Sequence, residues 1–276
     1  MVGAEVESVL APGINAVKTF DPPLQALVGA RVTGIRRRGK LFLIGLHASG
    51  PAGPEADLTL VVHLMSAGRL QLFDKRASLR DKTSRVLLRL GGGERELRLR
   101  EFGTKQRAWV KLLRHADVEM EETLSALGPE AWPDGPAPEA LRALLDQPRP
   151  LYALLRDQHV IAGIGRSWVD EILHTAMLSP FKRGADLTDA EAAVLREAID
   201  ARLGGAVHHY EQTLSLPLPD KLPLPLTVHR HNGEPCPRCG TTIEAVFYEE
   251  YVMCYCPVCQ TDGKVLKDRR LSRLLK

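Results

Sequence analysis

Alternating apolar and polar positions dominate the first 116 residues of the chain. Runs rich in Val, Ile and Leu occur within residues 4–10, 32–46, 58–73, 85–90 and 97–100. Such a period of two is typical of strands that bury one face. Gly91, Gly92 and Gly93 separate two of these runs and favour a turn between them. We therefore predict an antiparallel sandwich or barrel, which we assign as a β-sandwich domain over residues 1–130.

Beyond residue 137 the apolar positions follow a helical period instead. Helices are expected within residues 140–145, 151–155, 166–176 and 188–213. The last of these begins at Thr188, which has the capping-box spacing with Glu191. The four helices define a predicted helical domain over residues 137–220.

Two proline-rich segments punctuate this plan. Residues 129–138 contain four prolines and one glycine, with Gly128 just before them, and are predicted to be a linker. Pro217, Pro219, Pro223 and Pro225 follow the last predicted helix and are expected to form a stiff connector. The chain would thus consist of a sheet domain, a helical domain and a short C-terminal part.

The composition is that of a globular protein. Hydrophobic residues make up 44% of the 276 residues, and no apolar run approaches the roughly 20 residues that a membrane span needs. The sequence has no signal-peptide pattern. A chain of this length is expected to form two or three units. Four of the five cysteines have metal-binding spacing, which favours a reducing cytoplasm. We also predict a monomer, associated with the nucleoid if the source is bacterial.

Charge is distributed unevenly along the chain. Residues 1–116 carry a net charge of +10, residues 117–149 carry −6, residues 150–224 carry −3, and residues 225–276 carry +2. A basic first domain and a basic end favour a polyanionic partner such as nucleic acid. A basic face that is merely solvated has the same composition, so charge alone leaves both interpretations open.

The C-terminal part contains the spacing C-x2-C-x16-C-x2-C. Its members are Cys236, Cys239, Cys256 and Cys259. Two such pairs suit one tetrahedral zinc ion, and four thiolate ligands leave no open coordination position, so we predict a structural zinc. The alternatives are two disulfides or chance repetition. Alternating apolar residues between the pairs predict a β-hairpin, and Cys254 is expected to point away from the ligands. The predicted zinc finger covers residues 226–262, and a basic tail covers residues 263–276.

A glycine-containing motif lies between the second and third predicted helices. Residues 157–166 read Asp-Gln-His-Val-Ile-Ala-Gly-Ile-Gly-Arg, with Gly163 and Gly165 just before Arg166. Glycines before a helix allow backbone amides to approach a phosphate closely, although a tight turn would need them too. The motif resembles the helix–two-turns–helix motif of the formamidopyrimidine-DNA glycosylase and endonuclease VIII family.

Three other features resemble the same family in the same order. Lys40 lies in a basic hairpin, His63 to Leu70 resemble the strand that carries the wedge entering the base stack, and the Arg100–Gly103 stretch resembles the loop that fills the gap left by a flipped base. The resemblance covers nearly the whole chain. It implies an α+β protein with a β-sandwich, a helix–two-turns–helix domain and a four-cysteine zinc finger that binds double-stranded DNA containing damaged bases or abasic sites.

The implied chemistry is the excision of an oxidised base. The lesion nucleotide leaves the duplex, because its reacting sugar carbon is inaccessible within the stack. In the family, the secondary amine of an N-terminal proline attacks that carbon, the base leaves, and the Schiff base allows strand cleavage, with a neighbouring glutamate assisting proton transfer. The present sequence begins Met1-Val2-Gly3 and has no Pro-Glu start. No catalytic residue is therefore assigned, and we expect either a start codon placed too late or a truncated, inactive chain.

The candidate DNA-binding residues each have a structural alternative. They are Lys40, Arg100, Phe102, Gly163, Gly165 and Arg166. Lys40 and Arg100 could be solvated surface residues, Phe102 could belong to the core, and Arg166 could pair with Asp170 four residues later. His63, by contrast, is expected to be a satisfied core histidine, and His208 and His209 to lie on a helix face.

Several positions depart from the family pattern. Arg166 replaces a phosphate-binding asparagine, Tyr251 replaces the arginine of the finger, Ser66 replaces a wedge methionine beside Met65, and Glu101 replaces an arginine. Two functions from different classes remain: a DNA glycosylase with AP-lyase activity, or a non-catalytic binder of damaged or abasic DNA. A zinc-ribbon interaction module would leave the helical motif and Lys40 unexplained. The lesion preference cannot be derived from these residues.

Overall fold

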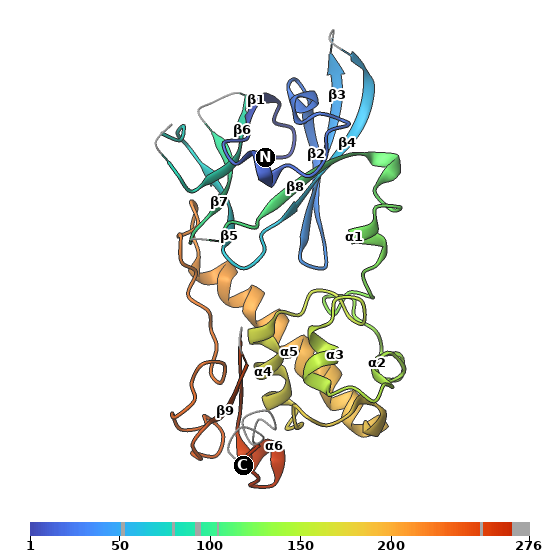
Figure 1. Ribbon diagram of the computed structural model, residues 1–276, viewed down its shortest axis with the longest axis vertical. Helices are drawn as coiled ribbons and strands as arrows, with labels where there is room; N and C mark the ends of the chain where they lie inside the picture. The colour runs from blue at the N-terminus through green and yellow to red at the C-terminus, as the bar shows by residue number, and fades with distance from the viewer. Residues whose placement is uncertain (51–52, 79–80, 92–94, 104, 249–250, 267–276) are drawn as a thin grey trace, which may run out of the picture. The chain divides into compact units, whose positions relative to one another are not determined.

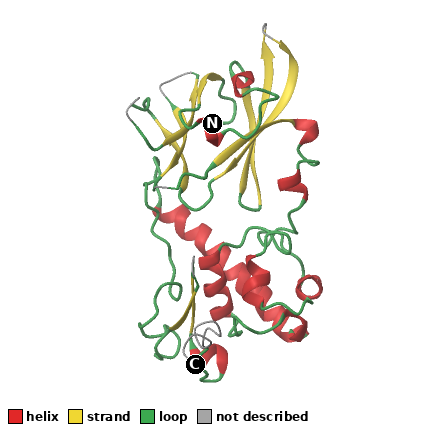
Figure 2. Cartoon of the chain, viewed as in Figure 1, coloured by secondary structure: helices red, strands yellow, loops and turns green. Residues whose placement is uncertain are grey.

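The computed structural model describes residues 1–50, 53–78, 81–91, 95–103, 105–248 and 251–266, with side chains described outside 49–55. The strands are β1 (Val6–Leu10), β2 (Arg31–Arg38), β3 (Leu41–Gly50), β4 (Gly53–His63), β5 (Gly68–Phe73), β6 (Ser84–Leu90), β7 (Glu96–Glu101), β8 (Trp109–Arg114), β9 (Glu244–Phe247) and β10 (Val252–Tyr255). The α-helices are α1 (Glu122–Ser125), α2 (Pro138–Leu145), α3 (Leu151–Arg156), α4 (Arg166–Thr175), α5 (Asp189–Thr213) and α6 (Pro257–Thr261). Figure 1 labels most of these elements, and Figure 2 shows the strands in the first half of the chain and most of the helices in the second.

The first eight strands form two antiparallel sheets, in the orders β1-β6-β7-β5 and β2-β3-β4-β8. Residues from both sheets enter one hydrophobic core, among them Val6 and Leu99 from the first sheet and Leu60 and Leu112 from the second. This arrangement confirms the predicted β-sandwich. The apolar run at residues 32–46 divides into two strands because Gly39 and Lys40 form a tight turn, where Gly39 has a φ of +56°.

The chain separates into two compact units. The sheet unit contains Met1–Ala126 together with Leu214–Leu222, and the helical unit contains Leu127–Thr213 and Pro223–Lys276. The core of the helical unit combines residues of α2 to α5 with Val246, Met253 and Tyr255 of the C-terminal hairpin. One face of the hairpin therefore belongs to the core of the helices, while Cys254 on the other face joins a separate small cluster with Val228 and Ile243.

Both proline-rich segments differ from simple linkers. Within residues 129–138, Ala131 is fully buried and its N–H donates to the Ala162 carbonyl (2.9 Å), so this stretch is part of the helical unit. The stretch Leu214–Leu222 lies against the sheet unit, where Gln71 Nε2 donates to the Leu218 carbonyl (2.5 Å). Proline removes a backbone donor but does not prevent packing, which explains why composition alone predicted linkers.

The capping box of α5 is present as predicted. The Thr188 N–H donates to Glu191 Oε2 (2.9 Å), and the Glu191 N–H donates to Thr188 Oγ1 (3.3 Å). No helix among the described residues is long and apolar enough to cross a membrane. The greater part of the predicted basic tail, residues 267–276, lies outside the described residues.

Candidate functional site

Lys40 lies exposed in the turn between β2 and β3. The register of the second sheet pairs Leu41 with His63, which brings Lys40 close to the end of β4. The pKa of His63 is lowered by burial and, secondarily, by the positive charge of Lys40. The hairpin lysine thus lies beside the turn that joins β4 to β5.

That turn presents a methionine to solvent. His63 Nδ1 accepts a hydrogen bond from the Met65 N–H (2.9 Å), and the His63 ring stacks on Trp109 at 5.4 Å between ring centres. Gly68 closes the turn by donating its N–H to the Leu64 carbonyl (2.8 Å). A Cβ at Gly68 would lie 2.4 Å from that oxygen, so the turn requires glycine. Met65, with a φ of +51°, is 42% exposed, which makes it the apolar side chain that the turn presents to solvent.

Phe102 lies next to the same turn. Its N–H donates to the Ala67 carbonyl (3.3 Å), and its ring lies 4.8 Å from the guanidinium carbon of Arg100. The sheet unit therefore brings Lys40, Met65 and Phe102 into one region, although they are far apart in sequence.

Arg100 is held by groups of its own unit. Its Nε donates to Thr83 Oγ1 (2.9 Å), its Nη1 donates to Asp220 Oδ1 (2.6 Å), and Asp81 lies 3.6 Å away. Only 14% of the side chain is exposed. The charge of Arg100 is consequently balanced by two carboxylates within the sheet unit.

Glu101 faces the interior and does not occupy a phosphate-contact position. It is 1% exposed, and its carboxylate accepts hydrogen bonds from the backbone of Arg107 (2.7 Å) and Ala108 (2.9 and 3.0 Å). Arg85 Nε lies 3.6 Å from it. The replacement of the arginine expected from the resemblance therefore gives the loop after β7 an internal anchor.

The glycine motif of the helical unit is organised by one glutamine. Gln158 Oε1 accepts the Gly163 N–H (2.9 Å), while its Nε2 donates to the carbonyls of Arg156 and Ile164 (both 3.1 Å). Gly163 has a φ of +103°, which favours glycine there. Gly165 is the N-cap of α4 and receives no side-chain cap, and the exposed Arg166 is the first residue of the helix.

Two buried carboxylates fasten α4 to the C-terminal segment. Glu171, fully buried, accepts hydrogen bonds from the N–H groups of Thr227, Val228 and His229 and from the Thr227 hydroxyl, at 2.8 to 3.0 Å. Asp170 Oδ2 lies 2.6 Å from His229 Nδ1 and accepts the Cys254 N–H (3.0 Å). Burial raises the pKa of Asp170 to about 6. Asp170 is thus engaged with the hairpin, which argues against its alternative role as the partner of Arg166.

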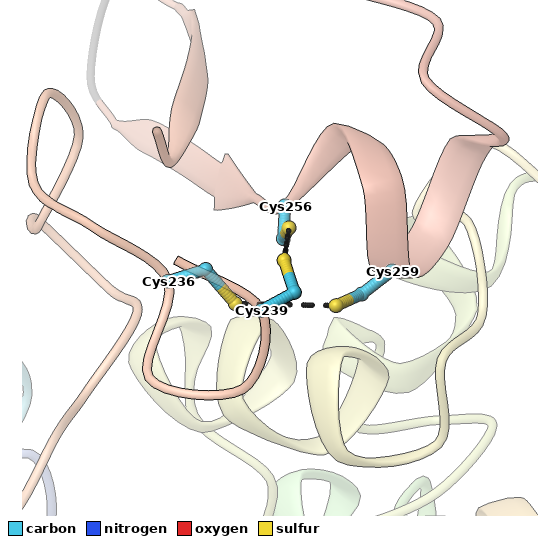
Figure 3. Close-up of side chains that lie close together, drawn as sticks. All are labelled: Cys236, Cys239, Cys256 and Cys259. Atoms are coloured by element: carbon cyan, nitrogen blue, oxygen red, sulfur yellow. Dashed lines mark hydrogen bonds between the residues drawn. The ribbon is translucent and has the colours of Figure 1, made fainter. Parts of the chain in front are cut away.

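The four predicted metal ligands come together at the end of the hairpin (Figure 3). The Sγ atoms of Cys236, Cys239, Cys256 and Cys259 all lie within 4.8 Å of one another. Two of the Sγ–Sγ distances are 3.4 Å and 3.9 Å. Tetrahedral zinc with Zn–S bonds of about 2.3 Å needs sulfurs about 3.8 Å apart, so the cluster fits this ion. Cys254 is buried outside the cluster, where its sulfur accepts the Arg230 N–H (3.3 Å), as expected for a residue that is not a ligand.

The cysteine cluster is attached directly to α4. Arg238 Nη1, on the first knuckle, donates to the His174 carbonyl (2.9 Å). His174 Nε2 lies 3.2 Å from Cys236 Sγ, and Gln260 Nε2 of α6 donates to the Leu178 carbonyl (2.9 Å). These contacts join the cluster to the C-terminal end of α4 and to the segment that follows it.

Comparisons with known proteins identify the class. Residues 1–105 match the formamidopyrimidine-DNA glycosylase N-terminal domain, and residues 127–217 match the formamidopyrimidine-DNA glycosylase H2TH domain. A formamidopyrimidine-DNA glycosylase of Moorella thermoacetica is 34% identical over 253 residues, covering 88% of this chain and 86% of that protein. This chain belongs to the formamidopyrimidine-DNA glycosylase family.

Other relatives agree with this assignment. An uncharacterised formamidopyrimidine-DNA glycosylase-like protein of Mycobacterium tuberculosis is 40% identical over 151 residues, which is 55% of this chain and 95% of that protein. The solved complex of Lactococcus lactis Fpg with DNA containing an abasic site has the same fold, with a TM-score of 0.80 at 23% identity, covering 95% of this chain and 94% of that one.

Proposed function

We propose that this protein acts in base excision repair as a DNA glycosylase on oxidised bases, with AP-lyase activity in a form that carries the N-terminal proline of the family. The observation that carries the proposal is the 34% identity to a formamidopyrimidine-DNA glycosylase over 88% of the chain. The side chains gathered in the sheet unit suit it, because Met65 is an exposed apolar residue able to enter a base stack and Lys40 supplies an adjacent positive charge.

Contacts to duplex DNA are assigned to both units. In the sheet unit they are Lys40, Arg100 and Phe102, with Arg100 first exchanging its internal carboxylates for a DNA group. In the helical unit they are Gly163, Gly165 and Arg166, at the start of α4. Uncapped backbone amides at a helix N-terminus favour a phosphate, and an exposed arginine there adds a charge-assisted donor.

The four cysteines would hold one structural zinc ion. Four thiolates complete a tetrahedral shell, so no position remains for substrate or water. When bound, zinc would cross-link the two knuckles. Arg238 and Gln260 would then transmit that rigidity to α4 through their bonds to backbone carbonyls.

The glycosylase proposal is tested by single-turnover cleavage of duplex DNA with one 8-oxoguanine, one formamidopyrimidine or one oxidised pyrimidine. Borohydride is added to trap the iminium as a stable amine. The assay uses a form of the protein that carries the N-terminal proline of the family, which should excise the base and become cross-linked. Protein of that form that binds lesion DNA but releases no base would contradict the proposal.

The second candidate function is a monomeric, non-catalytic binder of damaged or abasic DNA, which the exposed Met65 and the adjacent Lys40 suit equally well. Failure to release any base from lesion duplex, together with tighter binding to abasic than to intact duplex, would favour this alternative over the enzyme.

A further inference from the structure

Tyr251 stands where two arginines of the helical unit meet an aromatic cluster. The guanidinium carbon of Arg156, at the end of α3, lies 4.3 Å from the Tyr251 ring centre, and that of Arg166 lies 5.9 Å from the same centre. Tyr248 stacks on Tyr251 at 4.4 Å with an interplanar angle of 14°, and Tyr152 does so at 5.9 Å and 12°. Contacts with the rings of Tyr152 and Tyr251 restrict the orientation of the Arg156 guanidinium group, and the Arg166 guanidinium lies over the Tyr251 ring.

Within the part of the chain that the structure describes, Arg156 forms no ion pair with a carboxylate. Its described contacts are to the rings of Tyr251 and, at 5.7 Å, of Tyr152. Other arginines of the same unit pair with carboxylates, such as Arg149 with Asp157 (2.8 Å) and Arg183 with Asp186 (2.7 Å). A half-buried guanidinium over aromatic rings keeps its full positive charge and loses part of its hydration, so it attracts an anion strongly.

The hydroxyl of Tyr152, a residue only 4% exposed, and Nη1 of Arg156 are both buried, and neither makes a hydrogen bond of ordinary geometry. The Arg156 side chain lies close enough to that hydroxyl to lower the pKa of Tyr152, against the larger upward effect of burial. Buried polar groups are normally satisfied, so Nη1 of Arg156 has a donor that a phosphate oxygen can accept. The uncapped N-terminus of the ten-residue helix α4 contributes a favourable dipole next to Arg166.

We propose that Arg156 and Arg166, held over Tyr251, form a two-arginine site for a backbone phosphate of DNA. The inference deepens the proposed function and rests on it. By the resemblance, position 251 is where the finger would carry an arginine. In this chain the finger instead supplies an aromatic surface, and the charge comes from α3. Arg156 binds the phosphate directly, and Tyr251 is a positioning residue.

The experiment measures the affinity of residues 1–276, loaded with zinc, for duplex DNA with a tetrahydrofuran abasic site across a series of salt concentrations. Arg156→Gln should weaken binding about tenfold, the size of one charge-assisted hydrogen bond, and should lower the slope of log K against log salt by about 0.9. Tyr251→Leu should lower both the affinity and the salt slope although it removes no charge. Tyr251→Phe keeps the ring and should change neither the affinity nor the slope. Arg183→Gln is the matched control, because it removes the same charge from an arginine paired with Asp186.

The outcomes separate this inference from the proposed function. Thermal melts matching those of the unchanged protein confirm that the variants are folded. If Arg156→Gln does not fold, Arg156→Lys replaces it, since lysine keeps the charge but cannot stack as a planar guanidinium. If the unchanged protein binds abasic DNA and Arg156→Gln and Tyr251→Leu behave like Arg183→Gln, the two-arginine site is overturned and the proposed function stands. If the unchanged protein does not bind abasic DNA, the DNA contacts assigned under the proposed function fail and this inference fails with them.

Discussion

Arg100 of the sheet unit and Arg156 of the helical unit are surrounded by different kinds of group. Arg100 of the sheet unit donates to Thr83 and Asp220 and lies 3.6 Å from Asp81. Arg156 of the helical unit lies against Tyr152 and Tyr251. Carboxylates neutralise a guanidinium, whereas aromatic rings orient it and leave its charge available. The sheet unit is the more basic by sequence, yet its Arg100 is paired with carboxylates of the same unit. Net charge is therefore a poor guide to which arginines bind DNA.

Metal removal should have the largest effect, because it should lower hydrogen-exchange protection in the helical unit and leave the sheet unit unchanged. Stripping zinc with a chelator should loosen the cysteine cluster and, through Arg238 and Gln260, the C-terminal end of α4 and the segment that follows it. The apparent free energy of a structural zinc site is on the order of 10 kcal/mol. Hydrogen exchange should show lost protection in α4 and the hairpin, with β3 and β4 unchanged. Equal loss of protection in both units would contradict the comparison.

Glu171→Gln should be the most damaging single substitution of the helical unit. The carboxylate accepts four hydrogen bonds in a fully buried site, and an amide would direct its NH2 group at backbone donors. We expect a loss of about 3 kcal/mol in unfolding free energy. Urea unfolding followed by circular dichroism measures it. Glu197→Gln, an exposed position on the neighbouring helix α5, should cost less than about 0.5 kcal/mol. Similar losses for both variants would refute the anchoring role.

Asp170 should make the helical unit sensitive to pH. Its folded pKa of about 6 is above its ordinary value of 3.8 because of burial. A raised pKa stabilises the fold below the unfolded pKa, and that contribution is lost as pH rises through the folded pKa. Between pH 4 and 6 the unfolding free energy of the unchanged protein, measured relative to Asp170→Asn, should therefore fall by about 2 kcal/mol. A difference that is constant over this range, or that rises with pH, would show that the pKa is not raised.

The smallest effect should come from releasing Arg100. Asp220→Asn removes the carboxylate that holds Nη1, so DNA no longer has to displace it. We expect binding to abasic DNA to become about threefold tighter, within the range of a partly exposed ion pair. Asp74→Asn makes the same charge change at an exposed turn of the same unit and should have a smaller effect. If the two variants bind abasic DNA equally well, the ion pair between Arg100 and Asp220 does not affect DNA binding.

The sequence predicted the parts of this protein that follow local rules. The alternation of apolar residues indicated both sheets, Thr188 and Glu191 indicated the start of α5, and the spacing of the cysteines indicated their cluster. Each of these signals depends on residues close together in the chain or on a regular period. The family resemblance added the order of the domains.

The remaining features depend on contacts between distant residues. Asp220 meets Arg100 across 120 positions, and Glu171 meets Val228 across 57 positions. Nothing local marks either carboxylate as buried or paired. Gln158 was detectable only through its place in the glycine motif, and the stacking of Arg156 on Tyr251 required the hairpin to share a core with the helices.

The measurement that most directly tests the contrast between the two arginines is the salt dependence of DNA binding for Arg156→Gln and Arg100→Gln, side by side. Arg156 gains a phosphate without giving up a carboxylate, so its removal should lower the slope of log K against log salt by about 0.9. Arg100 exchanges one anion for another, so its removal should leave the slope nearly unchanged. A larger fall in slope for Arg100→Gln than for Arg156→Gln would contradict the account.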